Sequence, residues 1–335
     1  MQAAIYGLEG LELTEGERRF FRDAEPAGFI LFRRNCENND QLLRLTESLR
    51  ELAARDDVPI LIDQEGGRVA RMRAPQWPTF PAAEKFANLY RVAPSSAIEA
   101  VRANARALAL MLRSVGVNVN ALPLLDVRQE GASDIIGDRA LGSEPMQVAA
   151  LGRALLDGMA SAGVVGIIKH MPGHGRALVD SHKELPVVSA SPAELETDLE
   201  PFERLSAAPM GMTAHVVYTA WDQERPASMS PVVIRDIIRE RIGFNGWLMS
   251  DDIGMEALKG DFASRASGVV TAGCDVALHC SGRIEEMISV ASAVPPMSIE
   301  GHERLERAMA STRIESDHLD FAEEIAKRDQ LLALA

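Results

Sequence analysis

The strongest constraint on the fold is a regular alternation of short apolar segments with longer segments that have helical periodicity. The apolar segments cover residues 4–8, 28–32, 58–62, 117–126, 164–170, 211–217, 247–251 and 276–280. Largely apolar runs of this length are typical of strands that are buried on both faces of a parallel sheet. Eight strand–helix alternations in about 290 residues therefore predict an α/β protein with a (β/α)8 barrel.

The segments between these runs carry helix signals. Leucines at positions 42, 45, 49 and 52 form one apolar stripe at helical spacing. Residues 191–194 (SPAE) form a capping box with proline at the first helical position, and residues 14–17 repeat the capping-box spacing. Ser230-Pro231 is expected to open another helix, and residues 97–115 and 146–162 are long amphipathic candidates.

A doubly wound open sheet is the alternative architecture. A dinucleotide-binding version of it is disfavoured because no Gly-x-Gly-x-x-Gly follows the first apolar run. Residues 1–295 are predicted to form the catalytic barrel. Helical segments at 299–311 and 318–334 are predicted to form a C-terminal extension, residues 296–335, packed on that barrel.

Composition narrows the range of partners and compartments. The net charge of −14 disfavours nucleic acid and anionic membranes as partners. No stretch approaches ~18 consecutive apolar residues, so no transmembrane helix is expected. The three cysteines are too few and too scattered for a disulfide framework, and the first residues lack a secretory signal. A cytoplasmic location is expected.

Polar residues follow five of the predicted strands. They occur in residues 63–68 (DQEGGR), at Asp126 with the later loop 137–139, in residues 169–170, in residues 213–215 and in residues 250–252. A lone Asp after a strand is more often a helix cap than a catalyst. In a barrel, however, the carboxyl ends of all strands share one face, so the five polar ends together predict one functional site.

Three of the seven histidines, His170, His174 and His182, lie within thirteen residues after the run that ends at position 170. Histidine is only intermediate in its preference for burial, so three imidazoles in a Gly-rich loop are unlike core residues. The loop is predicted to be functional.

Carboxylates and imidazoles without a Gly-x-Ser-x-Gly nucleophile leave two enzyme classes open. One is a glycosidase that uses carboxylates. The other is a metallohydrolase with His170, His174, His182 and His215 as ligands, although the prolines and glycines around position 172 disfavour the helix that the His170–His174 spacing would need. Asp251 and Asp252 point to opposite faces of a strand, so one is expected to face the ligand and the other to bind backbone or a helix terminus.

Three motifs carry a resemblance to a known family: residues 63–68, residues 169–175 (KHMPGHG) with 180–182 (DSH), and residues 250–255 (SDDIGM). Together they closely resemble glycoside hydrolase family 3, specifically the short, single-domain bacterial β-N-acetylglucosaminidases of peptidoglycan recycling. The likeness covers nearly the whole chain, including residues 30–35, 136–139 and 214–218.

The resemblance implies a retaining mechanism without metal or cofactor. It makes Asp251 the nucleophile, His182 the general acid/base on a mobile loop, and Asp180 the partner of that histidine. The substrate-binding residues that it implies are Asp63, Arg68, Arg139, Lys169, His170, His215 and Met255.

The expected partner is a small carbohydrate, a muropeptide fragment that contains N-acetylglucosamine, and the expected state is a monomer or weak homodimer. A neutral imidazole repels phosphate less than a carboxylate would, so a phosphorylase is an alternative to a hydrolase. A catalytically silent sugar-binding barrel is a further alternative, which the presence of Asp251, Asp180 and His182 disfavours.

Overall fold

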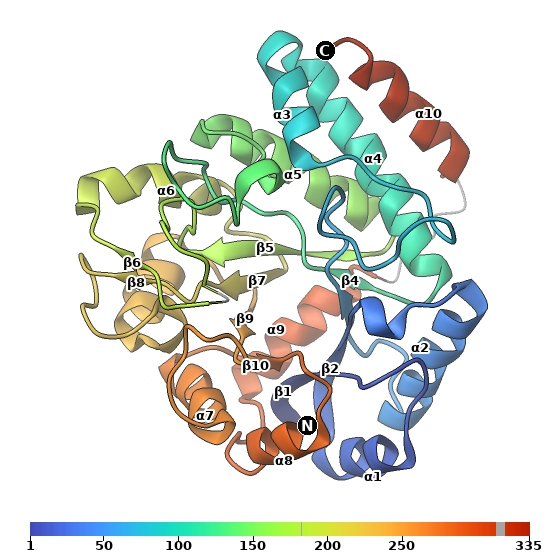
Figure 1. The fold of residues 1–335 in the computed structure, drawn as a ribbon, viewed down its shortest axis with the longest axis vertical. Helices are drawn as coiled ribbons and strands as arrows, with labels where there is room; N and C mark the ends of the chain where they lie inside the picture. Colours follow the sequence, from blue (N-terminus) through green and yellow to red (C-terminus); the bar gives the residue numbers. More distant parts are fainter. Residues whose placement is uncertain (182, 313–318) are drawn as a thin grey trace.

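The computed structural model describes residues 1–181, 183–312 and 319–335. In this part of the chain, parallel strands close into a barrel in the order β1-β10-β9-β7-β5-β4-β3-β2 (Figure 1). The strands are β1 (Gln2–Gly7), β2 (Pro26–Leu31), β3 (Ile60–Ile62), β4 (Val119–Asn120), β5 (Val165–Met171), β7 (Met210–Thr213), β9 (Trp247–Asp252) and β10 (Val276–His279). Each of the predicted apolar runs overlaps one of them, so the (β/α)8 barrel is confirmed and the open sheet is excluded.

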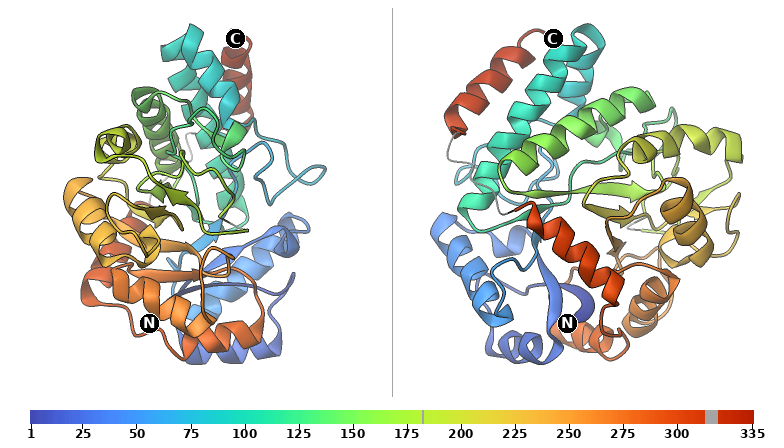
Figure 2. Two further views of the ribbon diagram at one scale, coloured as in Figure 1. Left: turned by 60° about the vertical axis from the view of Figure 1, so that its left-hand side comes forward. Right: turned by 180° about the vertical axis from the view of Figure 1, so that it is seen from behind.

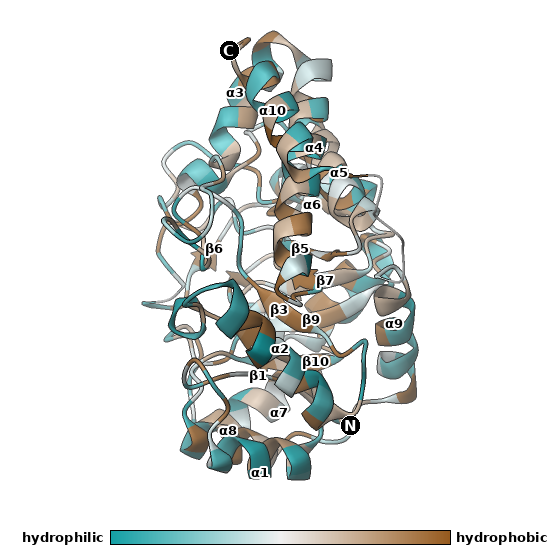
Figure 3. Ribbon diagram, turned by 90° about the vertical axis from the view of Figure 1, so that its right-hand side faces the viewer, coloured by the Kyte–Doolittle hydropathy of each residue, from teal (hydrophilic) through white to brown (hydrophobic). Residues whose placement is uncertain are grey.

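The strands are buried because helices cover the outside of the barrel and side chains fill its inside. Every residue of β2 and β5 is buried. Figure 3 shows the hydrophobic residues concentrated on the strands and the polar residues on the outer helix faces. The strands are therefore exposed to water only at the two ends of the barrel. Polar groups can be carried by the loops at the carboxyl ends of the strands.

Strand β4 is much shorter than the predicted run 117–126. Pro123 lacks an N–H group and cannot donate to a regular ladder. Hydrogen bonds to β5 nevertheless continue past the end of β4: Ile167 N donates to the Leu122 carbonyl at 2.9 Å, and Leu125 N donates to the Lys169 carbonyl at 2.7 Å. Asp126 directly follows Leu125, and its carboxylate contacts His170 on β5.

The described helices are α1 (Glu15–Ala24), α2 (Asn39–Ala53), α3 (Ala83–Val92), α4 (Pro94–Ser114), α5 (Pro145–Ser161), α6 (Pro192–Arg204), the π-helix η4 (Val233–Arg241), α7 (Phe262–Ala272), α8 (Ile284–Ala291), α9 (Ile299–Ala310) and α10 (Phe321–Leu332). Both predicted capping boxes are present, at Thr14 with Glu17 and at Ser191 with Glu194. None of the described helices combines the length and the apolar character needed to span a bilayer.

A second, two-stranded parallel sheet was not predicted. It pairs β6 (Val187–Val188) with β8 (Val217–Tyr218). Two-residue strands leave no periodic signal in a sequence. The pair ties the loop after β5 to the loop after β7 at the carboxyl end of the barrel.

The helices after residue 295 lie in two different places. Arg304 on α9 binds Asp275, just before β10, at 2.7 Å, so α9 lies against the amino ends of the strands, as the rear view in Figure 2 shows. Helix α10 instead runs along α4 (Figure 1), where Glu324 pairs with Arg106 at 3.3 Å. The division into domains at residue 295 stays a prediction.

Candidate active site

A cavity of about 410 Å³ opens at the carboxyl ends of the barrel strands. Its wall includes seven of the residues that the sequence analysis selected: Asp63, Arg68, Arg139, Lys169, His170, Asp251 and Met255. They come from β5, β9 and the loops after β3, β4 and β9, so the barrel brings together groups that are up to about 190 positions apart in the chain.

The other three selected residues are placed differently. His215 is fully buried behind the wall, where its ring nitrogens contact the Ser228 hydroxyl at 2.7 Å and the Asp252 carbonyl at 3.0 Å. Asp180 lies on the loop after β5, next to Ser181, which does line the cavity. His182 lies outside the described residues.

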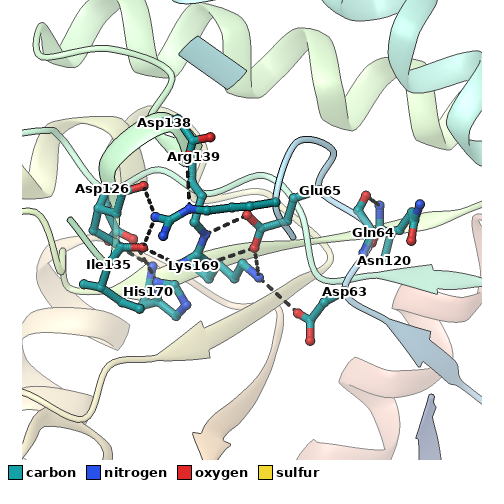
Figure 4. Close-up of polar contacts among 12 residues, drawn as sticks. Asp63, Gln64, Glu65, Asn120, Asp126, Ile135, Asp138, Arg139, Lys169 and His170 are labelled. Atoms are coloured by element: carbon teal, nitrogen blue, oxygen red, sulfur yellow. Dashed lines mark hydrogen bonds and ion pairs between the residues drawn. The ribbon is translucent and has the colours of Figure 1, made fainter. Parts of the chain in front are cut away.

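One side of the cavity is a network of buried charges (Figure 4). Lys169 Nζ lies 2.7 Å from Glu65 and 3.2 Å from Asp63, and only 2% of the lysine side chain is exposed. Glu65 also accepts two hydrogen bonds from Arg139, both of 2.8 Å. Arg71 closes the network with an ion pair to Asp63 at 3.0 Å.

The network keeps its acids ionised. Burial by itself would raise the pKa of Glu65, but the charges of Lys169 and Arg139 hold that pKa well below its usual range. The pKa of Asp63 is likewise lowered, because Lys169 and Arg71 outweigh the effect of burial. The wall therefore offers charged hydrogen-bonding groups in fixed positions, which suits the recognition of sugar hydroxyls.

The chain after β3 is shaped by two glycines. Gly66 has φ of 101°, and a Cβ atom there would lie 2.3 Å from the Pro81 carbonyl oxygen. Gly67 has φ of 55°, and its amide donates to the Phe80 carbonyl at 2.9 Å. This turn needs glycine at both positions, and it places Glu65 on one side and Arg68 on the other.

Gln64 holds the same segment from within. Its side-chain amide exchanges hydrogen bonds with the backbone of Met72, at 2.9 and 3.0 Å. Its own backbone exchanges two more with the side chain of Asn120 on β4, both of 3.0 Å. The loop that carries Asp63 and Glu65 is thus attached to the barrel although it has no regular secondary structure.

Asp126 is the centre of a second buried cluster. Its carboxylate lies 2.8 Å from His170 Nδ1 and accepts the backbone N–H groups of His170 and His174 at 3.1 and 2.7 Å. Its side chain is fully buried, yet these imidazoles and N–H groups lower its pKa. Asp126 therefore fixes the orientation of the His170 ring, which lines the cavity.

The loop after β5 is anchored at several points. His174 Nε2 lies 3.2 Å from the Ser181 hydroxyl, and burial lowers the pKa of His174 to about 4, so this ring is neutral near pH 7. Arg176 pairs with Asp198 on α6 at 2.5 Å, and the Tyr218 hydroxyl donates to the Gly173 carbonyl at 2.7 Å. These contacts hold the loop so that Ser181 lines the cavity.

The two acids at the end of β9 have different surroundings. Asp252 Oδ1 accepts the N–H groups of Gly254 and Cys280 at 2.9 and 3.2 Å, whereas Asp251 Oδ1 accepts the Asp252 N–H at 2.8 Å. Both carboxylates thus accept backbone N–H groups and both line the cavity, which differs from the expected division into one acid that faces the ligand and one that binds backbone. Burial raises the pKa of Asp252 to about 6.

Arg68 lies at the rim, with 45% of its side chain exposed. It binds Asp138 at 2.8 Å and the carbonyl oxygens of Asp134 and Ile135 at 2.6 and 2.9 Å. It joins the loop after β3 to the loop that carries Arg139, so that both sides of the cavity mouth are connected.

The resemblance assigned no role to five further residues of the wall or its support: Glu65, Arg71, Asp126, His174 and Ser181. Of these, the sequence analysis had placed Glu65 and Asp126 among the polar strand ends and His174 in the functional loop. A signal existed for Glu65, since alternation beyond the strand places it on the same side as Asp63. The role of Asp126 follows only from contacts with residues more than forty positions away.

Across residues 1–181, 183–312 and 319–335, no group of three or more His, Cys, Asp or Glu side chains is arranged to hold a metal ion. Nitrogens of His170, His174 and His215 are engaged by Asp126, Ser181, Ser228 and backbone, as described above. The arrangement is that of imidazoles fixed by hydrogen bonds within the protein.

A parallel barrel with acids and cations gathered at the carboxyl ends of its strands is an architecture suited to sugar chemistry. Residues 5–314 match the model of the glycosyl hydrolase family 3 N-terminal domain. The chain belongs to this family, and the resemblance noted in the sequence is confirmed.

Individual relatives within the family are named beta-hexosaminidases. The chain is 41% identical over 280 residues to a beta-hexosaminidase of Thioalkalivibrio sulfidiphilus, covering 82% of this chain and 79% of the relative. It is 36% identical over 332 residues to a beta-hexosaminidase of Bordetella avium, with coverage of 96% and 93%. Among solved structures it is similar to NagZ from Neisseria gonorrhoeae in complex with N-trifluoroacetyl-D-glucosamine, with a TM-score of 0.86, 31% identity and coverage of 100% and 98%.

Proposed function

We propose that this protein is a retaining exo-β-N-acetylglucosaminidase that uses Asp251 as its nucleophile. The observation that carries the proposal is the position of Asp251 in the same cavity as the charged wall of Glu65, Lys169 and Arg139. Support also comes from the relatives, which are named beta-hexosaminidases, and from the NagZ complex, whose ligand is an N-acylated glucosamine.

In the first step, a carboxylate oxygen of Asp251 attacks the anomeric carbon of the terminal sugar. The bond between that carbon and the glycosidic oxygen breaks, and its electron pair goes to the oxygen. His182 gives its proton to this oxygen, and the aglycone leaves as an alcohol. The sugar is then an ester of Asp251.

In the second step, His182 removes a proton from a water molecule as that water attacks the same carbon. The ester bond breaks, Asp251 is a carboxylate again and His182 is again protonated. Two inversions give net retention of the β configuration. Asp180 is proposed to orient the His182 ring and to stabilise its protonated form.

Within this proposal, the wall residues bind the sugar. Asp63, Arg68, Arg139, Lys169 and His170 are assigned to the hydroxyls and the acetamido group, with Met255 as an apolar contact. His215 is assigned a supporting role: its ring contacts the Asp252 carbonyl at 3.0 Å and so holds the end of β9, which carries Asp251, in position. No cofactor is assigned a part in either step.

The substrate is proposed to be a β-1,4-linked muropeptide fragment with a non-reducing terminal N-acetylglucosamine and a 1,6-anhydro-muramoyl aglycone. Its cleavage would serve peptidoglycan recycling in the cytoplasm, by a monomer or weak homodimer. These points rest on the family resemblance.

The test is to trap the covalent intermediate. A 5-fluoro N-acetylglucosaminyl fluoride slows both steps through its ring fluorine, while its good leaving group still lets the first step proceed, so the ester accumulates. Peptide mapping should find the added mass on Asp251. Labelling at another residue, or release of the α-anomer from an aryl β-glycoside, would refute the mechanism.

Product analysis with an aryl glycoside distinguishes a hydrolase from the phosphorylase alternative. Turnover of an aryl N-acetyl-β-glucosaminide in phosphate buffer should give free N-acetylglucosamine. Predominant formation of the sugar 1-phosphate would show that phosphate, and not water, accepts the glycosyl group.

A further inference from the structure

The C-terminal helix α10 contacts the loop that shapes the cavity, although it lies far from the catalytic acids in the chain. It begins at Phe321, beyond residue 314 where the match to the family model ends. It packs along α4 and also contacts α3, the helix that follows the β3–α3 loop (Figure 1). Its contacts with the loop before α3 connect it to the site.

Arg328 on α10 is a buried cation, with only 7% of its side chain exposed. Its guanidinium donates to Asn104 on α4 at 3.3 Å and pairs with Asp329 at 2.7 Å. It also lies over the ring of Phe80, with its central carbon 5.6 Å from the ring centre. A buried guanidinium is costly unless its surroundings use its charge, and an aromatic face is one such use.

Phe80 connects this helix to the glycine turn of the site. Its ring is buried under Arg328, and its carbonyl oxygen accepts the Gly67 N–H at 2.9 Å. The two residues after Phe80, Pro81 and Ala82, pack closely against the same turn. A Cβ atom on Gly66 would meet Pro81, and one on Gly67 would meet Ala82 at 2.7 Å. The turn therefore lies directly against residues 80–82 and is joined to them by the hydrogen bond from Gly67 to Phe80.

The Gly66–Gly67 turn fixes the positions of two residues of the cavity wall, Glu65 and Arg68. Glu65 directly precedes it and binds Lys169 and Arg139, while Arg68 directly follows it and binds Asp138. Two contacts, Arg328 with the Phe80 ring and the Phe80 carbonyl with Gly67, connect Arg328 to the turn whose neighbours Glu65 and Arg68 line the cavity.

We propose that Arg328 is a positioning residue, which through Phe80 fixes the Gly66–Gly67 turn, so that Glu65 holds Lys169 and Arg139 and Arg68 meets the sugar in a defined geometry. This inference rests on the proposed function for its kinetic test, but the contact chain can be tested without turnover. Helix α10 thereby becomes a support of the substrate-binding wall and not only a cover for α4.

The kinetic test compares Arg328→Ala with wild type on an aryl N-acetyl-β-glucosaminide. KM should rise about 3- to 10-fold, within the range of effects of residues that act on a site without touching its ligand. The kcat value should change less than about twofold, because displaced wall groups weaken the binding of substrate and transition state alike. Arg328→Lys, which keeps a cation over the ring, should recover most of the loss.

A double-mutant cycle with Phe80→Leu identifies the route. If Arg328 acts through the Phe80 ring, adding Phe80→Leu to Arg328→Ala should raise KM little further. Additive effects would show that Arg328 acts elsewhere. The matched control is Glu324→Gln, which weakens a different contact of α10, the ion pair with Arg106 at 3.3 Å, and should lower stability while leaving KM unchanged.

Hydrogen exchange gives a readout that needs no activity. The Gly67 amide, which donates to Phe80, should exchange faster in Arg328→Ala than in Glu324→Gln. Equal exchange at Gly67 and an unchanged KM in Arg328→Ala would overturn the inference. If wild type has no activity on the glycoside, the proposed function fails, while the exchange measurement still decides whether Arg328 holds the turn.

Discussion

Lys169 Nζ lies 2.7 Å from Glu65 Oε1, and both side chains are almost completely buried. The two residues are more than a hundred positions apart, one on β5 and one in the loop after β3. Arg139 shares the same carboxylate at 2.8 Å. Glu65 thus pairs with two buried cations, of which Lys169 also pairs with Asp63 at 3.2 Å.

Glu65→Gln should therefore be one of the most damaging neutral substitutions in the chain. The amide removes the carboxylate that Arg139 pairs with and leaves Lys169 with Asp63 alone, and breaking a buried ion pair costs about 3–5 kcal/mol. Urea denaturation should show a loss of this order, and KM for an aryl glycoside should rise. The matched control is Glu84→Gln, whose partner Arg128 is exposed, with an expected loss below about 1 kcal/mol.

Asp251→Ala should abolish turnover without unfolding the protein. Removal of the proposed nucleophile leaves no group to form the ester, so kcat should fall on the order of 10⁴-fold or more, comparable to loss of a catalytic-triad member. Steady-state kinetics and circular dichroism measure the two effects. Asp261→Ala, at the exposed N-cap of α7, should keep its activity, and a near-normal rate in Asp251→Ala would contradict the assignment.

His174 should make the protein sensitive to acid. Burial lowers the pKa of His174 to about 4, compared with about 6.5 for an unfolded histidine. The unfolded chain therefore takes up this proton first. The contribution of His174 to stability is complete above pH 6.5 and is lost as pH falls towards 4, amounting to about 3 kcal/mol. NMR titration of the His174 ring is the direct check, and a midpoint near 6.5 would disprove the expectation.

Asp252 should act in the opposite direction. Burial raises the pKa of Asp252 to about 6, above that of an unfolded aspartate, so its contribution to stability is greatest below pH 4 and is lost as pH rises through 6. Asp252→Asn keeps the oxygen that accepts from Gly254 and Cys280 and removes the charge. Between pH 4 and pH 8, this variant should gain up to about 2 kcal/mol relative to wild type, a reduced value because the side chain borders the open cavity. Denaturation midpoints at the two pH values test this, and parallel pH curves would argue against it.

Much of the fold could be predicted because strand and helix patterns are local. Each apolar run became a barrel strand, and the capping boxes at Thr14 and Ser191 began helices where expected. The family resemblance also selected seven of the residues that line the cavity. Predictions failed in detail where a local pattern was absent or interrupted, as for the two-residue strands β6 and β8 and for β4 before Pro123.

The sequence by itself determined the barrel, the face that carries the site and the family, because hydrophobic periodicity and motif residues are properties of neighbouring positions. Only the tertiary structure decided that Glu65 joins Lys169 to Arg139, that Asp126 orients His170, that His215 lies behind the wall and that Arg328 covers Phe80. Such pairs join distant segments, and their energies depend on burial and on distances that exist only after the barrel has closed.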